Sequence, residues 1–152
     1  MVQETETAMI HFFAYGEPKG QPRPRAFHRN GMTRMYDPST AEGWKGQIAI
    51  AARPFLPESP LDGPLYISAV FLLPRPKRLL RAKDPEGMIP HTSKPDTDNL
   101  AKALFDCLTE IQMWRDDAQI VLSRILKFYC EKNGRPGVSV VIDQWRSVND
   151  ET

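Results

Sequence analysis

This 152-residue sequence has few cysteines, few histidines and no long apolar run. Its two cysteines, Cys107 and Cys130, form no Cys-x-x-Cys pattern, which excludes a disulfide framework and a structural zinc centre; both are expected to be reduced and buried. The longest apolar runs, 48–52 and 69–73, are far shorter than the roughly 20 residues that cross a bilayer. Residues 1–6 are acidic, unlike a signal peptide, so no membrane association and a cytoplasmic location are expected.

Net charge is also small, +1 at neutral pH, but it is unevenly distributed. Residues 17–35 hold one acid and five basic side chains, Lys19, Arg23, Arg25, Arg29 and Arg34. Residues 75–83 hold no acid and five basic side chains, Arg75, Lys77, Arg78, Arg81 and Lys83. Residues 96–117 are acidic. Two basic segments and one acidic centre are the distribution that a metal-dependent nuclease needs, although each basic segment alone is also compatible with ordinary solvated surface.

Hydrophobic periodicity predicts a compact α+β domain over residues 1–152, with a mixed β-sheet packed against two main helices. The predicted strands are 9–15, 65–73, 118–129 and 138–142, and the predicted helices are 37–52 and 98–111. Residues 65–73 are expected to form a central strand. Residues 16–33 and 74–90, which are rich in proline and basic residues, are expected to be irregular loops, the second of them mobile. Residues 1–8 and 146–152 are expected to be frayed tails.

Carboxylates gather at the edges of the second predicted helix. Asp96 and Asp98 precede or open it, Lys102 lies four residues after Asp98 on the same face, and Asp116 and Asp117 open the next strand. One interpretation is structural: one aspartate caps the helix, Asp98 pairs with Lys102, and the second acidic pair ends a turn. The other is a Mg²⁺ site, because hard oxygen ligands suit this cation. The second interpretation requires the helix start and the strand start to meet in space.

The segment Lys94-Pro95-Asp96-Thr97-Asp98-Asn99-Leu100-Ala101-Lys102, followed by Asp106 and by Asp116-Asp117-Ala118-Gln119, resembles the core signature of the RusA family of Holliday junction resolvases. The resemblance is tight over residues 94–120 and looser over most of the chain. It implies a RusA-like fold, a homodimer acting on branched DNA (the four-way junction), Mg²⁺ as cofactor with Mn²⁺ as a substitute, and a bacterial, phage or prophage origin. It also implies a set of site residues. The catalytic acids and metal ligands would be Asp96, Asp98 and Asp117, with Asp116 as a further candidate ligand, and Lys102 would be the catalytic lysine. Residues 110–115 depart from the pattern because they lack the glycine expected after the helix.

We therefore expect a Mg²⁺-dependent, structure-specific endonuclease that resolves Holliday junctions by paired symmetric nicks in DNA recombination and repair. The ten cations of the two basic segments would hold the DNA arms, and Phe27, Met35 or Tyr36 is a candidate wedge at the junction centre. Two alternatives stay open: a catalytically silent protein that only binds branched DNA, and a broader enzyme that cuts flaps or forks. Repulsion between carboxylates and phosphates argues against the first. Residues 9–15 and 138–145 are candidates for the dimer interface or for the monomer core.

Overall fold

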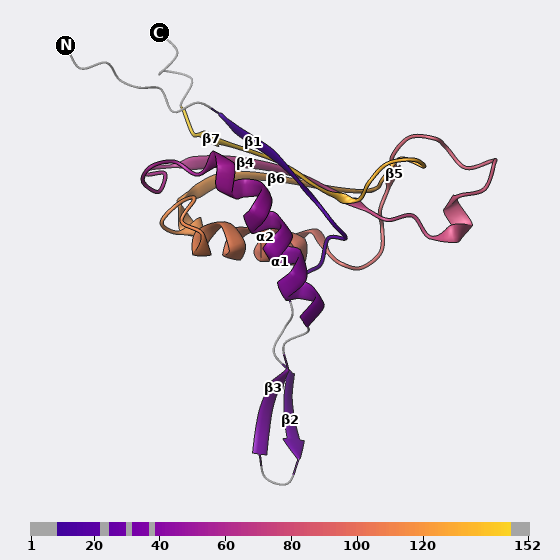
Figure 1. Ribbon diagram of the computed structural model, residues 1–152, viewed down its shortest axis with the longest axis horizontal. Helices are drawn as coiled ribbons and strands as arrows, with labels where there is room; N and C mark the ends of the chain where they lie inside the picture. The colour runs from indigo at the N-terminus through magenta and orange to yellow at the C-terminus, as the bar shows by residue number, and fades with distance from the viewer. Residues whose placement is uncertain (1–8, 22–24, 30–31, 37–38, 147–152) are drawn as a thin grey trace.

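The computed structural model describes residues 9–21, 25–29, 32–36 and 39–146, with only the backbone for 25–29, 32–36 and 39–40. Its elements follow one another along the chain as shown in Figure 1. They are β1 (Ile10–Tyr15), β2 (Arg25–Arg29), β3 (Met32–Tyr36), α1 (Ser39–Ala52), the 3-10 turn η1 (Arg53–Phe55), β4 (Leu65–Leu73), η2 (Lys77–Leu79), β5 (Ile89–Pro90), α2 (Thr97–Glu110), η3 (Asp117–Gln119), β6 (Ile120–Tyr129) and β7 (Gly137–Gln144).

Five strands form one sheet in the order β1-β7-β4-β6-β5. The β4–β6 pair is parallel, and the other pairs are antiparallel, so the sheet is mixed. Helices α1 and α2 lie on the same side of the sheet (Figure 1). The predicted α+β class with two main helices is therefore confirmed, and so is the central position of β4.

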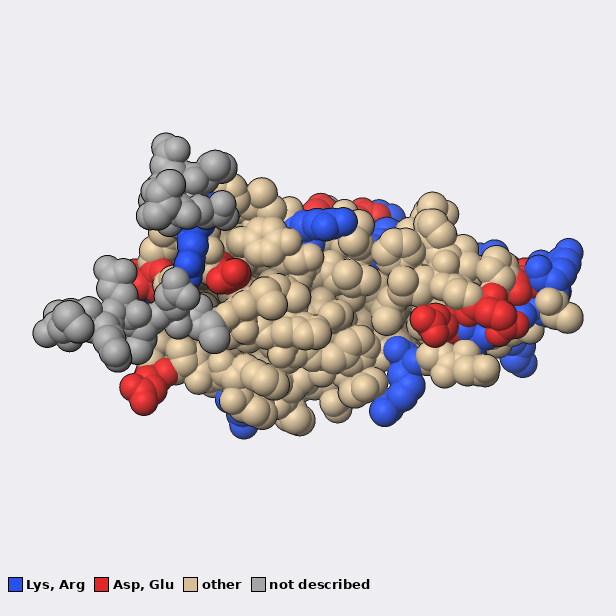
Figure 2. Space-filling view, turned by 90° about the horizontal axis from the view of Figure 1, so that it is seen from above, with Lys and Arg blue, Asp and Glu red and all other residues tan. Residues whose placement is uncertain are grey.

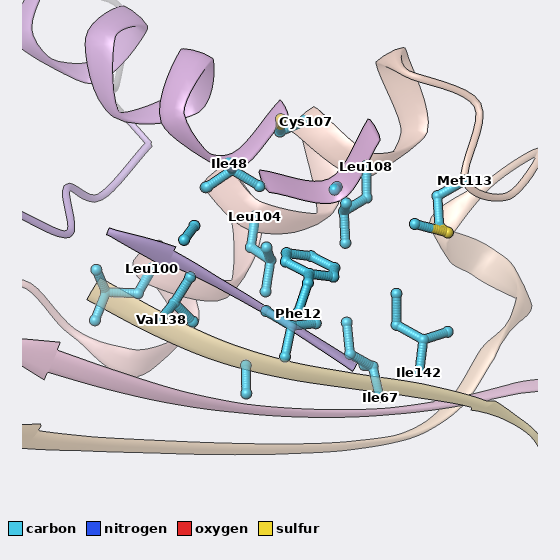
Figure 3. Packing of buried hydrophobic residues seen from close by; sticks show 14 of the residues in the cluster. Phe12, Ile48, Ile67, Leu100, Leu104, Cys107, Leu108, Met113, Val138 and Ile142 are labelled. Carbon is cyan, nitrogen blue, oxygen red and sulfur yellow. The ribbon is translucent and has the colours of Figure 1, made fainter. Parts of the chain in front are cut away.

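The core lies between the two helices and the sheet. Burial alternates strictly along β4, so that Leu65, Ile67, Ala69, Phe71 and Leu73 all face the helices. Helix α2 contributes the apolar stripe that its sequence predicts, with Leu100, Ala103, Leu104, Cys107 and Leu108 buried. Figure 3 shows these side chains meeting Phe12, Ile48 and Val138 in one continuous cluster. The buried Cys107 and Cys130 carry free thiols, as expected.

The opposite face of the sheet has no helix over it in the described part of the chain. Strand register places Phe13 of β1, Ser139 of β7, Val70 of β4 and Leu126 of β6 in one row across this face. We call it the open face. Tyr15, Leu72 and Phe128 lie in the next row, on the same side.

Two segments expected to be irregular contain regular elements. Residues 25–29 form β2, which pairs with β3 as an antiparallel hairpin. The five residues between Pro24 and Asn30 contain no proline, so they can form a short strand. The hairpin extends away from the sheet and helices in Figure 1. Residues 74–90 include η2 and β5, and hydrogen bonds described below hold this segment. None of the described helices is long and apolar enough to cross a membrane.

Helix α2 ends without the glycine that its following turn usually requires. Gln112 takes that position with a φ of 66°, in the left-handed region. The amide of Gln112 donates to the Thr109 carbonyl at 3.1 Å, and the amide of Met113 donates to the Leu108 carbonyl at 3.0 Å. This bond pattern is a Schellman cap. The turn geometry is therefore the usual one despite the missing glycine.

Candidate active site

Asp96 and Asp98 stand at the start of α2. Asp96 is the N-cap residue through its backbone, and its carbonyl accepts from the Leu100 amide at 3.0 Å. Its carboxylate does not cap the helix and instead accepts from the Lys94 ammonium at 2.9 Å. Asp98 lies in the first helical turn, where the helix dipole favours a negative charge. Both side chains are exposed.

Lys102 pairs with Asp106, one helical turn later, rather than with Asp98. The distance from Lys102 Nζ to Asp106 Oδ2 is 3.6 Å. The lysine is largely exposed, whereas the Asp106 side chain is 29% exposed. Such a pair adds little stability at a surface, but it holds the ammonium on the side of α2 that faces η3. The expected Asp98–Lys102 pairing of the structural interpretation is not what the structure shows.

Asp116 and Asp117 have different environments. The Asp116 carboxylate accepts from the Ala118 amide at 2.8 Å, while Gln119 Oε1 accepts from the Asp116 amide at 3.0 Å, which completes a capping box on η3. Gln119 Nε2 in turn donates to the carbonyls of Leu61 and Gly63, each at 3.0 Å. The structural interpretation therefore applies to Asp116, and its bonds hold the neighbouring Asp117 in place.

The electrostatics of Asp117 reflect its closeness to the middle of α2. Desolvation, a hydrogen bond with Asp116, and the negative charges of Asp116 and Asp106 raise the pKa of the Asp117 carboxyl, whereas Lys102 lowers it. The middle of α2, at Lys102 and Asp106, therefore lies near the start of η3. The meeting of Asp96 and Asp98 with Asp117, which the metal-site interpretation requires, stays a prediction. Three carboxylates and one ammonium share this corner of the molecule, which we call the acidic corner: Lys102, Asp106, Asp116 and Asp117.

The donor set suits a cation with a loose protein shell. Among the described residues, no three His, Cys, Asp or Glu side chains gather closely enough to hold one metal ion. Mg²⁺ commonly takes only one or two carboxylates and keeps several waters, so exposed aspartates fit it better than they fit a metal held in a full protein cage. Close to α2, the backbone amide of Gln21 donates to the Asn99 carbonyl at 3.1 Å. The side-chain oxygen Oε1 of Gln21 is buried without a hydrogen-bond partner in the described structure. This amide oxygen is a further hard ligand type.

Sequence reasoning missed Lys127. Its ammonium donates to the carbonyls of Ser93 and Pro95, directly before Asp96. Strand alternation was the available signal, because Ile125, Lys127 and Tyr129 share the core-facing side of β6 and a lysine there is uncommon. Asp106, by contrast, belongs to the predicted motif, but only the structure shows its ion pair.

Residues 74–90, which we call the arm, are held by Arg75. Its Nε donates to the Cys130 carbonyl at 2.8 Å and its Nη1 to the Leu79 carbonyl at 3.0 Å. Its Nη2 donates to the carbonyls of Glu86 and Gly87. One guanidinium therefore joins both ends of the arm to the end of β6. In this conformation the guanidinium donors are engaged within the protein, and DNA contact by Arg75 stays a prediction.

Lys132, which follows β6, also holds the arm. Its ammonium donates to the Arg81 carbonyl at 2.7 Å and lies 3.4 Å from Glu86 Oε1, and its amide donates to the Glu86 carbonyl at 3.0 Å. Arg81 itself pairs with Asp84, whose pKa is lowered although desolvation opposes the shift: hydrogen bonds and charge from Arg81 outweigh it. The remaining predicted DNA contacts of the arm, Lys77, Arg78 and Lys83, are exposed.

The other predicted DNA contacts lie between β1 and α1. Lys19 pairs with Glu17 at 3.2 Å. Arg23 lies outside the described residues, as do the side chains of Arg25, Arg29 and Arg34 on the hairpin and of the candidate wedges Phe27, Met35 and Tyr36. Their roles stay predictions.

The chain is similar to known proteins over most of its length. The profile of a family described as Endodeoxyribonuclease RusA matches residues 15–143. "Uncharacterized protein YqaN" of Bacillus subtilis (strain 168) is 36% identical over 138 residues, which cover 88% of this chain and 94% of that protein. "Crossover junction endodeoxyribonuclease RusA" of Escherichia coli (strain K12) is 47% identical over 50 residues, covering 33% of this chain and 42% of that protein. A protein of the same description from Enterobacteria phage 82 matches to the same extent.

Proposed function

We propose a DNA-cutting function from the premise that this chain belongs to the Endodeoxyribonuclease RusA family. Membership makes it a nuclease, a hydrolase acting on DNA. We infer that its substrate is the four-way junction, which it resolves by paired symmetric nicks in recombination and repair. We further propose that it is a cytoplasmic enzyme of bacterial or phage origin.

One observation carries the proposal: the meeting of the α2 face with η3. It brings Asp117 into the field of Asp106, Asp116 and Lys102. Carboxylates so arranged repel one another and would also repel DNA phosphates. A protein that only bound DNA would gain nothing from these carboxylates. A phosphodiester-cleaving centre, in contrast, needs acids to hold a cation and a positive charge to orient the phosphate.

In the proposed mechanism each residue has a separate task. Asp96 and Asp98 at the start of α2 and Asp117 at the start of η3 would hold Mg²⁺, for which Mn²⁺ would substitute, and Asp116 would fix the position of Asp117. Because no three described carboxylates gather closely enough to hold one ion, the cation would have to draw these two segments together. When bound, Mg²⁺ supplies Lewis-acid charge that activates water and stabilises the leaving oxygen. Lys102 contacts the scissile phosphate and stabilises its developing charge, and Asp106 keeps this ammonium near η3 until DNA arrives.

We also propose that the protein works as a twofold homodimer. Two symmetric nicks require two sites, and each chain has one acidic corner. The open face of the sheet suits a second copy because Phe13, Val70 and Leu126 run across it. Figure 2, seen from above the sheet, shows a wide area with few charged residues and charges gathered towards its ends. Self-complementary apolar patches of this kind are typical of twofold interfaces.

Sedimentation at micromolar concentration tests the dimer. The expected mass is about twice the 17.3 kDa of the chain. Val70→Glu, which places a charge in the middle of the open face, should give monomers. Ile50→Glu on the outer side of α1, an exposed apolar position far from this face, is the matched control and should leave the dimer intact. A dimer that survives Val70→Glu would place the interface elsewhere.

Cleavage of a synthetic immobile four-way junction tests the function itself. We expect paired nicks with Mg²⁺ and none in excess EDTA, with linear duplex uncut. Flap and fork substrates belong in the same assay, because equal rates on them would identify the broader endonuclease. Tight junction binding without any cutting at all would identify the silent binding protein.

A further inference from the structure

Lys127 ties the segment before the candidate catalytic aspartates to the sheet. Its ammonium nitrogen donates to the Ser93 carbonyl at 2.6 Å and to the Pro95 carbonyl at 2.9 Å. The backbone contributes as well, since the His91 amide donates to the Lys127 carbonyl at 3.3 Å. Strand β6 therefore holds residues 91–95 through both the main chain and the side chain of one residue.

The tethered segment leads directly into the proposed metal ligands. Asp96 follows Pro95 and is the N-cap of α2, and Asp98 lies in the first turn. The path of residues 93–95 therefore decides where both carboxylates lie relative to the rest of the site. The other lysine of the segment, Lys94, contacts Asp96 itself, and its side chain is 85% exposed.

The chemistry of the tether indicates a purpose beyond neutralising a charge. Both acceptors are neutral backbone carbonyls, and hydrogen bonds from an ammonium are stronger and shorter than neutral ones. Lys127 is only partly exposed and shares the core-facing side of β6 with Ile125 and Tyr129. An ammonium is unfavourable in such a place unless its donors are satisfied. Here they are satisfied by the backbone that carries the acidic site.

We propose that Lys127 is a positioning residue for Asp96 and Asp98. By holding residues 93–95 against β6, it fixes the start of α2 before Mg²⁺ and DNA arrive. The start of α2 then presents Asp96 and Asp98 to the cation from a fixed backbone, which is how groups behind metal ligands raise affinity and activity. This inference rests on the proposed function, because it assumes that the two aspartates bind the cation.

The test compares three variants with the wild-type protein. Lys127→Met removes the donors and keeps the length of the side chain, and Lys127→Arg restores several donors. Arg53→Met, the control, removes a positive charge from an exposed position of η1, away from the open face. We expect Lys127→Met to lower kcat for junction cutting by about 10- to 100-fold with little change in KM. Lys127→Arg should recover most of the rate, and Arg53→Met should cut at the wild-type rate.

Two measurements that do not depend on cutting accompany the kinetics. Amide hydrogen exchange over residues 92–99 should be faster in Lys127→Met and unchanged in Arg53→Met. Calorimetric titration with Mg²⁺ should show weaker binding in Lys127→Met alone. If that variant does not fold, Lys127→Gln, which keeps a shorter neutral donor, takes its place in all three assays.

Particular results would overturn the proposal. Wild-type kcat in Lys127→Met would do so, and so would faster exchange over residues 92–99 without any loss of kcat or of Mg²⁺ affinity, which would make the tether structural only. A wild-type protein that binds Mg²⁺ but cuts no branched DNA would instead refute the proposed function. The exchange and titration results would still decide whether Lys127 positions the aspartates.

Discussion

The arm and the acidic corner are both charged, but they use charge in opposite ways. In the arm, Arg75 and Lys132 direct their donors at backbone carbonyls, so charge there determines the path of the chain. In the acidic corner three carboxylates lie close together, and desolvation together with these neighbouring carboxylates raises the pKa of Asp117. The first arrangement stabilises the fold, whereas the second costs stability and is favourable only when a cation is bound. A charge in the sequence therefore has no fixed meaning until its partners are known.

The largest expected effect concerns the start of the site. Asp98→Asn should lower junction cutting by about 10²- to 10³-fold, the range for removing one group that stabilises transition-state charge. Junction binding should be unchanged or tighter, because one repulsion between carboxylate and phosphate disappears. Single-turnover cutting and a binding titration in EDTA measure the two effects. Full activity in the folded variant would remove Asp98 from the site.

Breaking the main brace of the arm should affect folding more than chemistry. Arg75→Ala removes charge-assisted bonds to carbonyls at both ends of the arm, and we expect a loss of about 2 kcal/mol in the free energy of unfolding. Denaturant unfolding measures this loss, and hydrogen exchange over residues 76–87 should become faster. Lys77→Ala, at an exposed position of the same arm, is the control and should unfold like the wild type. Equal stability of Arg75→Ala and the control would contradict the bracing role.

The exposed cations of the arm should show the reverse behaviour. Changing Arg78 and Lys83 together to Ala should leave stability unchanged but weaken junction binding. Each lost phosphate contact should also reduce the slope of log affinity against log salt by about 0.9. Binding measured at several salt concentrations gives this slope. An unchanged slope would show that these side chains are ordinary solvated surface.

A smaller effect concerns pH and the segment that Lys127 holds. Burial, with a further contribution from the charge of Lys127, keeps the pKa of His91 below its ordinary value of 6.5. The unfolded chain therefore binds more protons than the folded protein, and stability should fall as the pH drops below about 6.5. His91→Phe keeps the ring that contacts Tyr129 and should flatten this dependence. Melting temperatures at pH 5 and pH 7.5 compare the two proteins, and identical slopes would refute the role of His91.

The smallest expected effect lies in the turn between α2 and the acidic corner. Gln112 adopts a φ of 66°, which is unfavourable for a residue with a Cβ atom. Gln112→Gly should therefore raise the free energy of unfolding by about 0.5–1 kcal/mol without changing the cutting rate. Denaturant unfolding is precise enough to detect it. A loss of stability would mean that the Gln112 side chain makes a contribution larger than the backbone strain.

Prediction from sequence worked where one periodic signal governed an element. The central strand β4 was predicted from its continuous apolar run, and helix α2 was predicted from an apolar stripe that the structure buries. It failed for the β2–β3 hairpin, where nearby prolines obscured a short ladder. It also gave all five cations of the arm the same role, because spacing does not show that Arg75 reaches the carbonyl of Cys130.

The sequence by itself determined the fold class, the two helices and the acids and lysine of the candidate site, because periodicity and motif spacing are local properties of the chain. Only the tertiary structure decided which charges act together. It paired Lys102 with Asp106, brought Asp117 to the face of α2, and joined Lys127 to the carbonyls before Asp96. Such contacts depend on how a helix, a turn and a strand pack against one another. Electrostatic and hydrogen-bonding energies fall steeply with distance in space, which the distance along the chain does not reveal.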